Sequence, residues 1–179
     1  ASLKKLRSGL RMPVAVMTYY NLLLGPGLER FCDMSAGVVD GLIVPDLLPE
    51  EAGSLRRLAS ERDIDTVFFV SPTTERQRIP LIDRSSSGFV YYVSVTGTTG
   101  SRATFGKDVY SQVSTVRKIL SAPVCAGFGI SEPEHVRAFS RVCDGVIVGS
   151  AFIKTIAAAR NRRAAVDAAG RLAKWLMSV

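Results

Sequence analysis

Short apolar runs alternate with longer amphipathic stretches along all 179 residues of the chain. Each run is too short for a buried helix and is rich in β-branched and aromatic residues, which predicts a buried strand. The predicted strands are the runs Val14 to Met17, Gly41 to Val44, Asp65 to Val70, Phe89 to Val93, Val124 to Gly127, and Val146 to Val148. Between them, helical spacing predicts helices over 28–35, from Pro49-Glu50-Glu51 onward, over 109–120 and over 162–177.

This alternation predicts an α/β fold with a parallel sheet. Nearly continuous apolar strands are covered on both faces, and right-handed crossovers join parallel neighbours. The spacing of roughly 25 to 35 residues suits βα units. We therefore expect one domain over residues 1–179 with about six such units. Pro80 is expected to kink or end a weaker helix after the third strand, and Ser131 with Glu134 has the spacing of a capping box.

The stretch from Val124 to Ala151 carries the first sign of chemistry. Two successive strands end in glycine turns, at Gly129 and at Gly149-Ser150, and each turn leads into a helix. Glycine lets a backbone approach a ligand closely, and a helix N-terminus offers free N–H groups and partial positive charge. Two such turns on neighbouring strands predict a phosphate site. The alternative is that these glycines only tighten two turns.

The formal net charge of +7 changes this picture little. The basic residues are dispersed, without basic-aromatic interleaving or a helix-turn-helix pattern, which favours a solvated surface that attracts an anionic substrate over a nucleic-acid interface. His135 is the only histidine and lies in a predicted exposed helical turn, so the pattern disfavours a catalytic histidine. The three cysteines, Cys32, Cys125 and Cys143, are scattered without metal-ligand spacing.

Two further patterns concern location. No apolar run is long enough to span a bilayer. The basic segment 1–12 lacks the apolar core of a signal peptide. We therefore expect a cytoplasmic protein with reduced cysteines, no metal, and neither a membrane nor a nucleic-acid partner.

Four segments together resemble the tryptophan synthase alpha chain: GLIVPDLLPEE, FVYYVSVTGTTGSR, CAGFGISEPEHVRAF and DGVIVGSAFIK. They occur in the family's order and spacing and cover essentially the whole chain. The resemblance implies a (β/α)8 TIM barrel that cleaves indole-3-glycerol phosphate to indole and glyceraldehyde 3-phosphate in tryptophan biosynthesis. It implies an α2β2 assembly with the beta chain, which carries the pyridoxal phosphate, and no cofactor in this chain.

The resemblance also assigns residues to the site. It places the substrate phosphate at Gly97, Thr99, Gly100, Gly129, Gly149 and Ser150. Thr99 matches the threonine of the mobile loop that closes over the substrate. Tyr91 and Phe128 would wall the indole pocket. Further lining would come from Met17, Tyr19, Ile43 and Phe69, each of which could equally be a core residue. The turn ending at Pro49 would face the beta chain, as would Asn21 and Asp46.

One departure from the family is large. The family's first two βα units, which carry a catalytic glutamate and a catalytic aspartate, are missing here, and the six expected strands leave two open sheet edges. Asp46 ends a strand but suits capping and interface roles better than catalysis. Leu3, Leu6 and Leu10 recur at helix-like spacing, so the chain begins within a predicted helix. Because it also begins at Ala1 without methionine, we expect it to be part of a longer protein.

Two classes of function therefore remain. The chain is either the carboxyl two-thirds of an active alpha chain or a catalytically dead remnant that binds a phosphate ligand or the beta chain. A third reading, another phosphate-binding barrel of histidine or pyrimidine metabolism, is disfavoured by VSVTGTTG.

Overall fold

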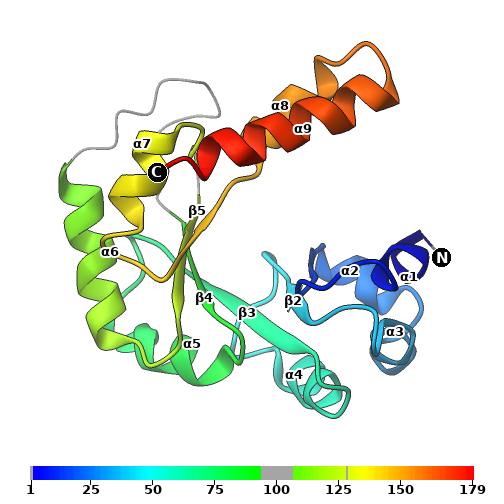
Figure 1. The fold of residues 1–179 in the computed structure, drawn as a ribbon. Helices are drawn as coiled ribbons and strands as arrows, with labels where there is room; N and C mark the ends of the chain where they lie inside the picture. Colours follow the sequence, from blue (N-terminus) through cyan, green and yellow to red (C-terminus); the bar gives the residue numbers. More distant parts are fainter. Residues whose placement is uncertain (1, 94–106, 128) are drawn as a thin grey trace. The chain divides into compact units, whose positions relative to one another are not determined.

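The computed structural model describes residues 2–93, 107–127 and 129–179 (Figure 1). The predicted residues Gly97, Thr99, Gly100 and Phe128 lie outside this range. The chain divides into two compact units. Unit 1 comprises Ala1–Phe69 and Glu75–Val90, and unit 2 comprises Val70–Thr74 and Tyr91–Val179. The expectation of one domain over the whole chain stays a prediction.

Unit 1 contains the first three strands, which run parallel in chain order. β1 (Ala15–Met17) pairs with β2 (Gly41–Ile43), and β2 pairs with β3 (Asp65–Val70). The helices of the unit are α1 (Ser2–Arg7), α2 (Tyr20–Leu24), α3 (Leu28–Ser35), α4 (Gly53–Ser60), η1 (Arg76–Arg78) and α5 (Ile79–Ser85). Its buried core includes Leu23, Cys32, Leu42, Leu55, Val67, Phe68, Ile79 and Ile82.

Unit 2 continues the same alternation. β5 (Val124–Gly127) and β6 (Gly145–Ile147) are parallel neighbours, and β4 (Val90–Val93) enters the unit at Tyr91. Its helices are α6 (Lys107–Ile119), α7 (Pro133–Phe139), α8 (Ser150–Ala157) and α9 (Arg162–Leu176). Phe139 and Tyr92 are almost completely buried, and the ring of Phe139 lies 4.9 Å from that of Tyr110 between their centroids.

Three helix starts differ from the prediction. Pro49-Glu50-Glu51 forms a turn closed by Glu51 N–H to Leu48 O, and α4 begins only at Gly53. Pro80 stands in the first turn of α5 rather than ending a helix, since an N-terminal proline lacks only a donor that the helix does not use. The short helix α2 was not predicted.

The predicted capping box at Ser131 is also wrong. Glu132 is the N-cap of α7, and it makes no side-chain cap hydrogen bond. Pro133, the next residue, disfavours helical backbone at Glu132 and opens the helix itself. The Ser131 N–H instead donates to His135 Nδ1 at 3.4 Å. His135 is half-buried, not exposed as expected.

Burial of the strands is uneven. β2 is fully buried, as its apolar sequence predicted, whereas β6 is half-buried and β1 exposes Ala15 and Met17. Each of these two strands pairs with one neighbour only within the described parts of its unit. Among the described residues, no helix has the length and apolar character that crossing a bilayer requires.

An aspartate fastens the start of one strand pair in each unit, β1–β2 and β5–β6. In unit 2, Asp144 stands just before β6 and makes two hydrogen bonds with Val124, the first residue of β5. Its backbone N–H donates to Val124 O, and its side-chain carboxylate accepts the Val124 N–H at 2.8 Å. The same carboxylate pairs with Arg117 of α6, with Nε and Oδ2 2.5 Å apart. One side chain thus holds a helix and two strands together.

Unit 1 repeats this arrangement. Asp40, just before β2, accepts the Val14 N–H at 2.6 Å and pairs with Arg7 of α1 at 2.9 Å, while its own N–H donates to Val14 O. In both units the arginine lies seven positions before the fastened amide. We call these two arrangements the aspartate clasps.

The clasp of unit 2 should contribute measurably to stability. Asp144→Ala removes a charged acceptor of a backbone N–H and should lower the free energy of unfolding by about 1.5–3 kcal/mol. Asp144→Asn keeps a side-chain acceptor and should cost less. Urea unfolding followed by the fluorescence of Trp175, the single tryptophan, measures both.

The matched control is Asp167→Ala on the exposed surface of α9. It should change the free energy of unfolding by no more than about 0.5 kcal/mol. Equal effects of Asp144→Ala and Asp167→Ala would contradict a role of the clasp.

Candidate functional site

The two predicted glycine turns lie at the same end of neighbouring strands. The register pairs Gly127 with Ile147 at the carboxyl ends of β5 and β6. Gly129 and Gly149 each follow two residues later, so the parallel register brings both turns to one edge of the strand pair. The two turns are therefore neighbours, and the phosphate site that the sequence predicts there stays a prediction.

The first turn needs its glycine. Gly129 has a φ of +72°, in the left-handed region that side chains with a Cβ rarely adopt. The residue is exposed, while Ile130 directly after it is buried and anchors the turn. The backbone at Gly129 is therefore open to a ligand and held by the core beneath it.

The second turn opens α8. Gly149 is the N-cap without a side-chain cap, and a Cβ built on it would meet nothing within 4 Å. The Ile153 N–H donates to Gly149 O, so the N–H groups of Ser150, Ala151 and Phe152 precede the intrahelical pattern. Together with the positive end of the helix dipole, they form a site suited to an anion.

Tyr91 of β4 packs directly over the end of β5. A Cβ added to Gly127 would come within 2.6 Å of the Tyr91 Cε2 and closer still to its hydroxyl oxygen. Burial raises the pKa of the Tyr91 phenol, which keeps it protonated at neutral pH. A neutral aromatic ring therefore lies beside the strand end that leads into the first glycine turn. The sequence indicated Tyr91 but not its contact with Gly127.

The two cysteines near this site are structural. Cys125 Sγ occupies the space beside Gly145, 2.7 Å from where a Cβ would stand. Cys143 Sγ lies 3.2 and 3.1 Å from the carbonyl oxygens of Phe139 and Gly145, which share its single proton. Burial raises the pKa of the Cys125 thiol to about 11 and also raises the pKa of Cys143. Both thiols are thus protonated and poorly nucleophilic at neutral pH. Within the described ranges, no cluster of residues could hold a metal ion.

The predicted lining residues of unit 1 have different surroundings. Met17 and Ile43 are register partners on β1 and β2, but Met17 is exposed and Ile43 is buried. Tyr19 is 63% exposed and Phe69 is half-buried. Burial at Ile43 fits the alternative of a core residue, whereas Met17 and Tyr19 are accessible to a ligand or a partner.

The predicted interface residues gather around α2. Both carboxylate oxygens of Asp46 accept the Tyr20 N–H, at 2.9 and 3.2 Å, so Asp46 satisfies an amide in the first turn of α2. The sequence suggested a capping role for Asp46 but not this helix. Asn21 lies in α2 and Pro49 in the turn after Asp46. Sequence reasoning missed two exposed leucines of α2, Leu22 and Leu24; the only available signal was three consecutive leucines in a short segment.

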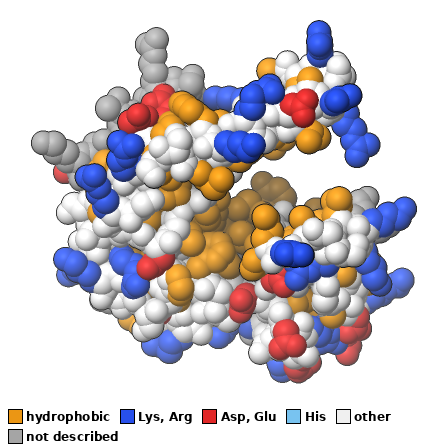
Figure 2. All heavy atoms as spheres, in the orientation of Figure 1, with side chains coloured by type: hydrophobic (Ala, Val, Ile, Leu, Met, Phe, Trp, Pro, Cys, Tyr) orange, Lys and Arg blue, Asp and Glu red, His pale blue; other side chains and the backbone are white. Residues whose placement is uncertain are grey.

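Basic side chains are dispersed on the one face that Figure 2 draws. On the face drawn in Figure 2, the Lys and Arg side chains are scattered and do not form a continuous stripe. A stripe or patch of basic residues is the footprint of a nucleic-acid interface, and this face shows none.

Comparisons with known proteins extend these observations. The family model for the tryptophan synthase alpha chain matches residues 2–176. The tryptophan synthase alpha chain of Geotalea daltonii is 41% identical over 155 residues, which are 86% of this chain and 59% of the relative. That of Prochlorococcus marinus strain MIT 9313 is 50% identical over 156 residues, 86% of this chain and 57% of the relative.

Solved structures agree. A chain of the tryptophan synthase α2β2 complex from Pyrococcus furiosus superposes with a TM-score of 0.88 at 35% identity, covering 99% of this chain and 71% of that one. The fold is therefore α/β of the (β/α)8-barrel type, as predicted, with six βα units present. The chain belongs to the tryptophan synthase alpha chain family. It spans somewhat less than two thirds of the length of these curated relatives.

The contact between Tyr91 and Gly127 can be tested by substitution. Gly127→Ala places a methyl group against the tyrosine ring and should lower the free energy of unfolding by about 1–3 kcal/mol. The control is Gly170→Ala in α9, where a Cβ meets nothing within 4 Å. This change should raise the free energy of unfolding by about 0.5–1 kcal/mol. Urea unfolding of both variants measures the difference.

A double variant tests whether the contact with the Tyr91 ring causes the loss of stability in Gly127→Ala. If the collision with Tyr91 causes the loss, adding Tyr91→Ala to Gly127→Ala should cost less than the sum of the two single variants. Strict additivity would show that the two residues do not interact.

Proposed function

We propose that this chain serves as a tryptophan synthase alpha chain, the subunit that cleaves indole-3-glycerol phosphate to indole and glyceraldehyde 3-phosphate. Family membership supports the reaction. The observation that supports the role of these residues is the pair of open glycine turns at Gly129 and Gly149, beside the start of α8.

In this proposal the substrate phosphate lies against the backbone of both turns. Its oxygens accept N–H bonds from the first turn of α8, at Ser150 and the two residues after it, and the helix dipole stabilises its charge. Gly129, which is exposed and has no side chain of its own, provides the opposite side. The resemblance adds Gly97, Thr99 and Gly100 to this site.

The indole ring lies against the aromatic wall. Tyr91 is held over Gly127 and stays protonated, so it offers an apolar ring face without introducing charge. Phe128, between the two glycines of the turn, is assigned to the same wall by the resemblance. The resemblance also assigns Met17, Tyr19, Ile43 and Phe69 of unit 1 to the lining.

Acid–base chemistry needs groups beyond these. Protonation of C3 of indole and deprotonation of the glycerol hydroxyl require positioned proton donors and acceptors. Asp46 is occupied by the Tyr20 N–H through both oxygens, which suits a cap better than a proton carrier. We assign the catalytic glutamate and aspartate to the family's first two βα units, which have no counterpart among these 179 residues.

The partner in this proposal is the beta chain, which would carry the pyridoxal phosphate of the α2β2 assembly. The similar chain of Pyrococcus furiosus belongs to such a complex. The proposed interface includes Asn21, Asp46 and Pro49. The same segments also expose the apolar side chains of Tyr19, Leu22, Leu24 and Leu48. Apolar groups ringed by polar ones are typical of protein interfaces.

A non-catalytic chain is the second candidate. It rests on the catalytic pair having no counterpart among these 179 residues. Residues 1–179 would then bind phosphate without turning over substrate. Exposed apolar side chains on α8 and α9, including Ile153 and Val166, favour the first candidate instead, because they suit a further covering element such as the family's first βα units (Figure 2). Activity measurements distinguish the two candidates.

Residues 1–179 alone should not release indole at an enzymatic rate. Each positioned acid or base contributes about 10²- to 10⁴-fold, so lacking both removes most of the catalysis. Supplying the family's first two βα units, fused or as a separate fragment, should restore indole release. Robust turnover by protein whose intact mass equals that of residues 1–179 would contradict this assignment.

The phosphate position has its own test in the complemented enzyme. Ser150→Asp places a negative charge at the start of α8, which favours the helix but repels the phosphate. We expect KM for indole-3-glycerol phosphate to rise about tenfold or more, with no loss of thermal stability. Ser150→Ala keeps the backbone donors and should raise KM far less. An unchanged KM in Ser150→Asp would place the phosphate elsewhere.

Thr99 provides a third test in the same enzyme. Thr99→Val removes a hydroxyl that the resemblance assigns to the closing loop, and should lower kcat by about tenfold, the equivalent of one hydrogen bond. The urea midpoint should stay unchanged. A variant that unfolds instead would show that Thr99 is structural.

A further inference from the structure

Unit 1 contains a cavity of about 330 Å³ at the amino end of β3. One side is formed by a single face of α4, where Gly53, Arg56, Arg57 and Ser60 recur at helical spacing. The other side comes from the end of α5 and from β3, through Arg84, Ser85, Ser87 and Thr66. Its volume lies at the small end of the range for ligand pockets, about 300–1,000 Å³.

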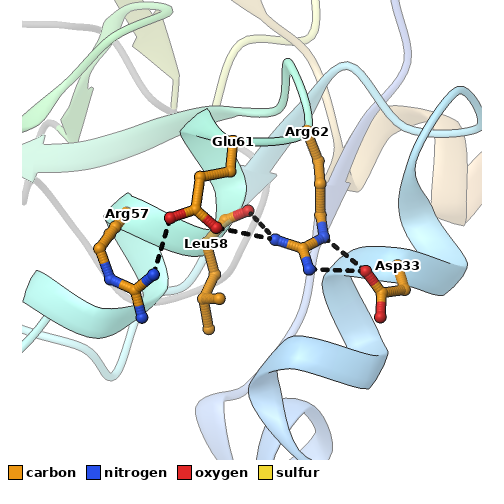
Figure 3. A network of polar contacts seen from close by, with 5 residues as sticks. All are labelled: Asp33, Arg57, Leu58, Glu61 and Arg62. Carbon is orange, nitrogen blue, oxygen red and sulfur yellow. Dashed lines mark hydrogen bonds and ion pairs between the residues drawn. The ribbon is translucent and has the colours of Figure 1, made fainter.

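The charged side chains that line this cavity are all positive. Arg57 is partly neutralised, since it pairs with Glu61 at 2.7 Å in the network that links α4 to Asp33 of α3 (Figure 3). Arg84, in contrast, has no side-chain hydrogen bond or ion pair within the described parts of the chain. The cavity therefore has at least one uncompensated guanidinium.

The acceptors at the end of α5 are already used. Arg56 Nη2 donates to Arg84 O at 2.8 Å, and the Thr66 hydroxyl donates to Ser85 O at 3.0 Å. These bonds satisfy two of the carbonyls that a helix end leaves open. The groups left for a ligand are mainly donors, which selects an anion over a cation.

One buried hydroxyl has no partner in this arrangement. Ser85 is 2% exposed, and its Oγ has no hydrogen-bond partner within the described residues. Leaving a polar group buried and unsatisfied costs free energy, so such groups are rare. Ser87 Oγ, which accepts the Thr66 N–H, still has its own proton to donate. Both serines line the cavity, and the Ser85 Oγ, which is itself inaccessible to solvent, would reach a ligand there after rotation about χ1.

We propose that this cavity binds the phosphoryl group of a small anion, held by Arg84 and Arg56 and by the hydroxyls of Ser85 and Ser87. A guanidinium with several nearby hydroxyl donors matches the charge and the multiple acceptors of a phosphate. The site is distinct from the substrate site, because active sites of this fold class lie at the carboxyl ends of the strands, whereas this cavity lies at an amino end.

The test uses inorganic phosphate and glycerol 3-phosphate as probes, with glycerol as the uncharged control. Backbone amide shifts in NMR spectra report residues 84–87 separately from residues 149–152, so binding here is distinguished from binding at α8. We expect both phosphates, but not glycerol, to shift the amides of 84–87. A larger response to glycerol 3-phosphate than to inorganic phosphate would identify an ester as the preferred source.

Two variants test the assigned groups. Arg84→Gln should weaken phosphate binding at residues 84–87 about tenfold or more and leave the shifts at 149–152 unchanged. Arg30→Gln, on the exposed surface of α3, removes the same charge away from the cavity and should have little effect.

Ser85→Ala separates a ligand-binding hydroxyl from a structural one. It should weaken phosphate binding at this site severalfold without lowering the urea midpoint, since the hydroxyl has no protein partner to lose. The proposal is overturned if millimolar phosphate does not shift the amides of 84–87, or if both Arg84→Gln and Ser85→Ala bind phosphate like the unaltered protein.

Discussion

The structure depends on two carboxylates that each fasten a helix and two strands. Asp40 and Asp144 accept the first amide of one strand, stand at the start of the next, and bind an arginine from the preceding helix. Parallel strands come from distant parts of the chain, so their register needs fixing by something other than a turn. The clasps do this at the amino ends, which leaves the carboxyl ends free for loops that bind ligands.

The register of β5 and β6, which the clasp of unit 2 fixes, also determines the geometry of the candidate site. Once Cys125 is level with Gly145, the two glycine turns must lie side by side at the far end of the strands. The backbone donors at the start of α8 thus owe their position to packing at the opposite end. A phosphate site built from backbone in this way depends on register more than on any one side chain.

Hydrophobic patterning was sufficient for the strands and for most helices, because continuous apolar runs and helical spacing are local properties. Helix α3 was predicted at Leu28–Ser35, where the structure has it, and the six strands lie within a residue or so of the predicted runs. The errors occurred where two local rules compete. At Ser131 a capping motif preceded a proline that opened the helix itself, and at Pro49 a helix-start pattern closed a turn instead.

The candidate site was predictable in its glycine turns and, through the family resemblance, at Tyr91, but not in the contacts between them. Glycine at two strand ends is a sequence signal, and so were the two Asp-Gly pairs of the clasps, each with an arginine seven positions before the fastened amide. The cavity beside Ser85 has no such signal. It joins one face of α4 to the end of α5, and its most informative feature, a hydroxyl without a partner, exists only after the chain has folded.

The close fit of Tyr91 over Gly127 has a consequence for the history of the family. Any side chain at position 127 would occupy the space of the ring, so the two positions are not free to vary independently. Lineages that replace the glycine should carry a smaller residue at the position of the tyrosine, and the pair should appear as a covariation between β4 and β5. The shape of the aromatic wall is thus inherited as a pair of residues, not as a single one.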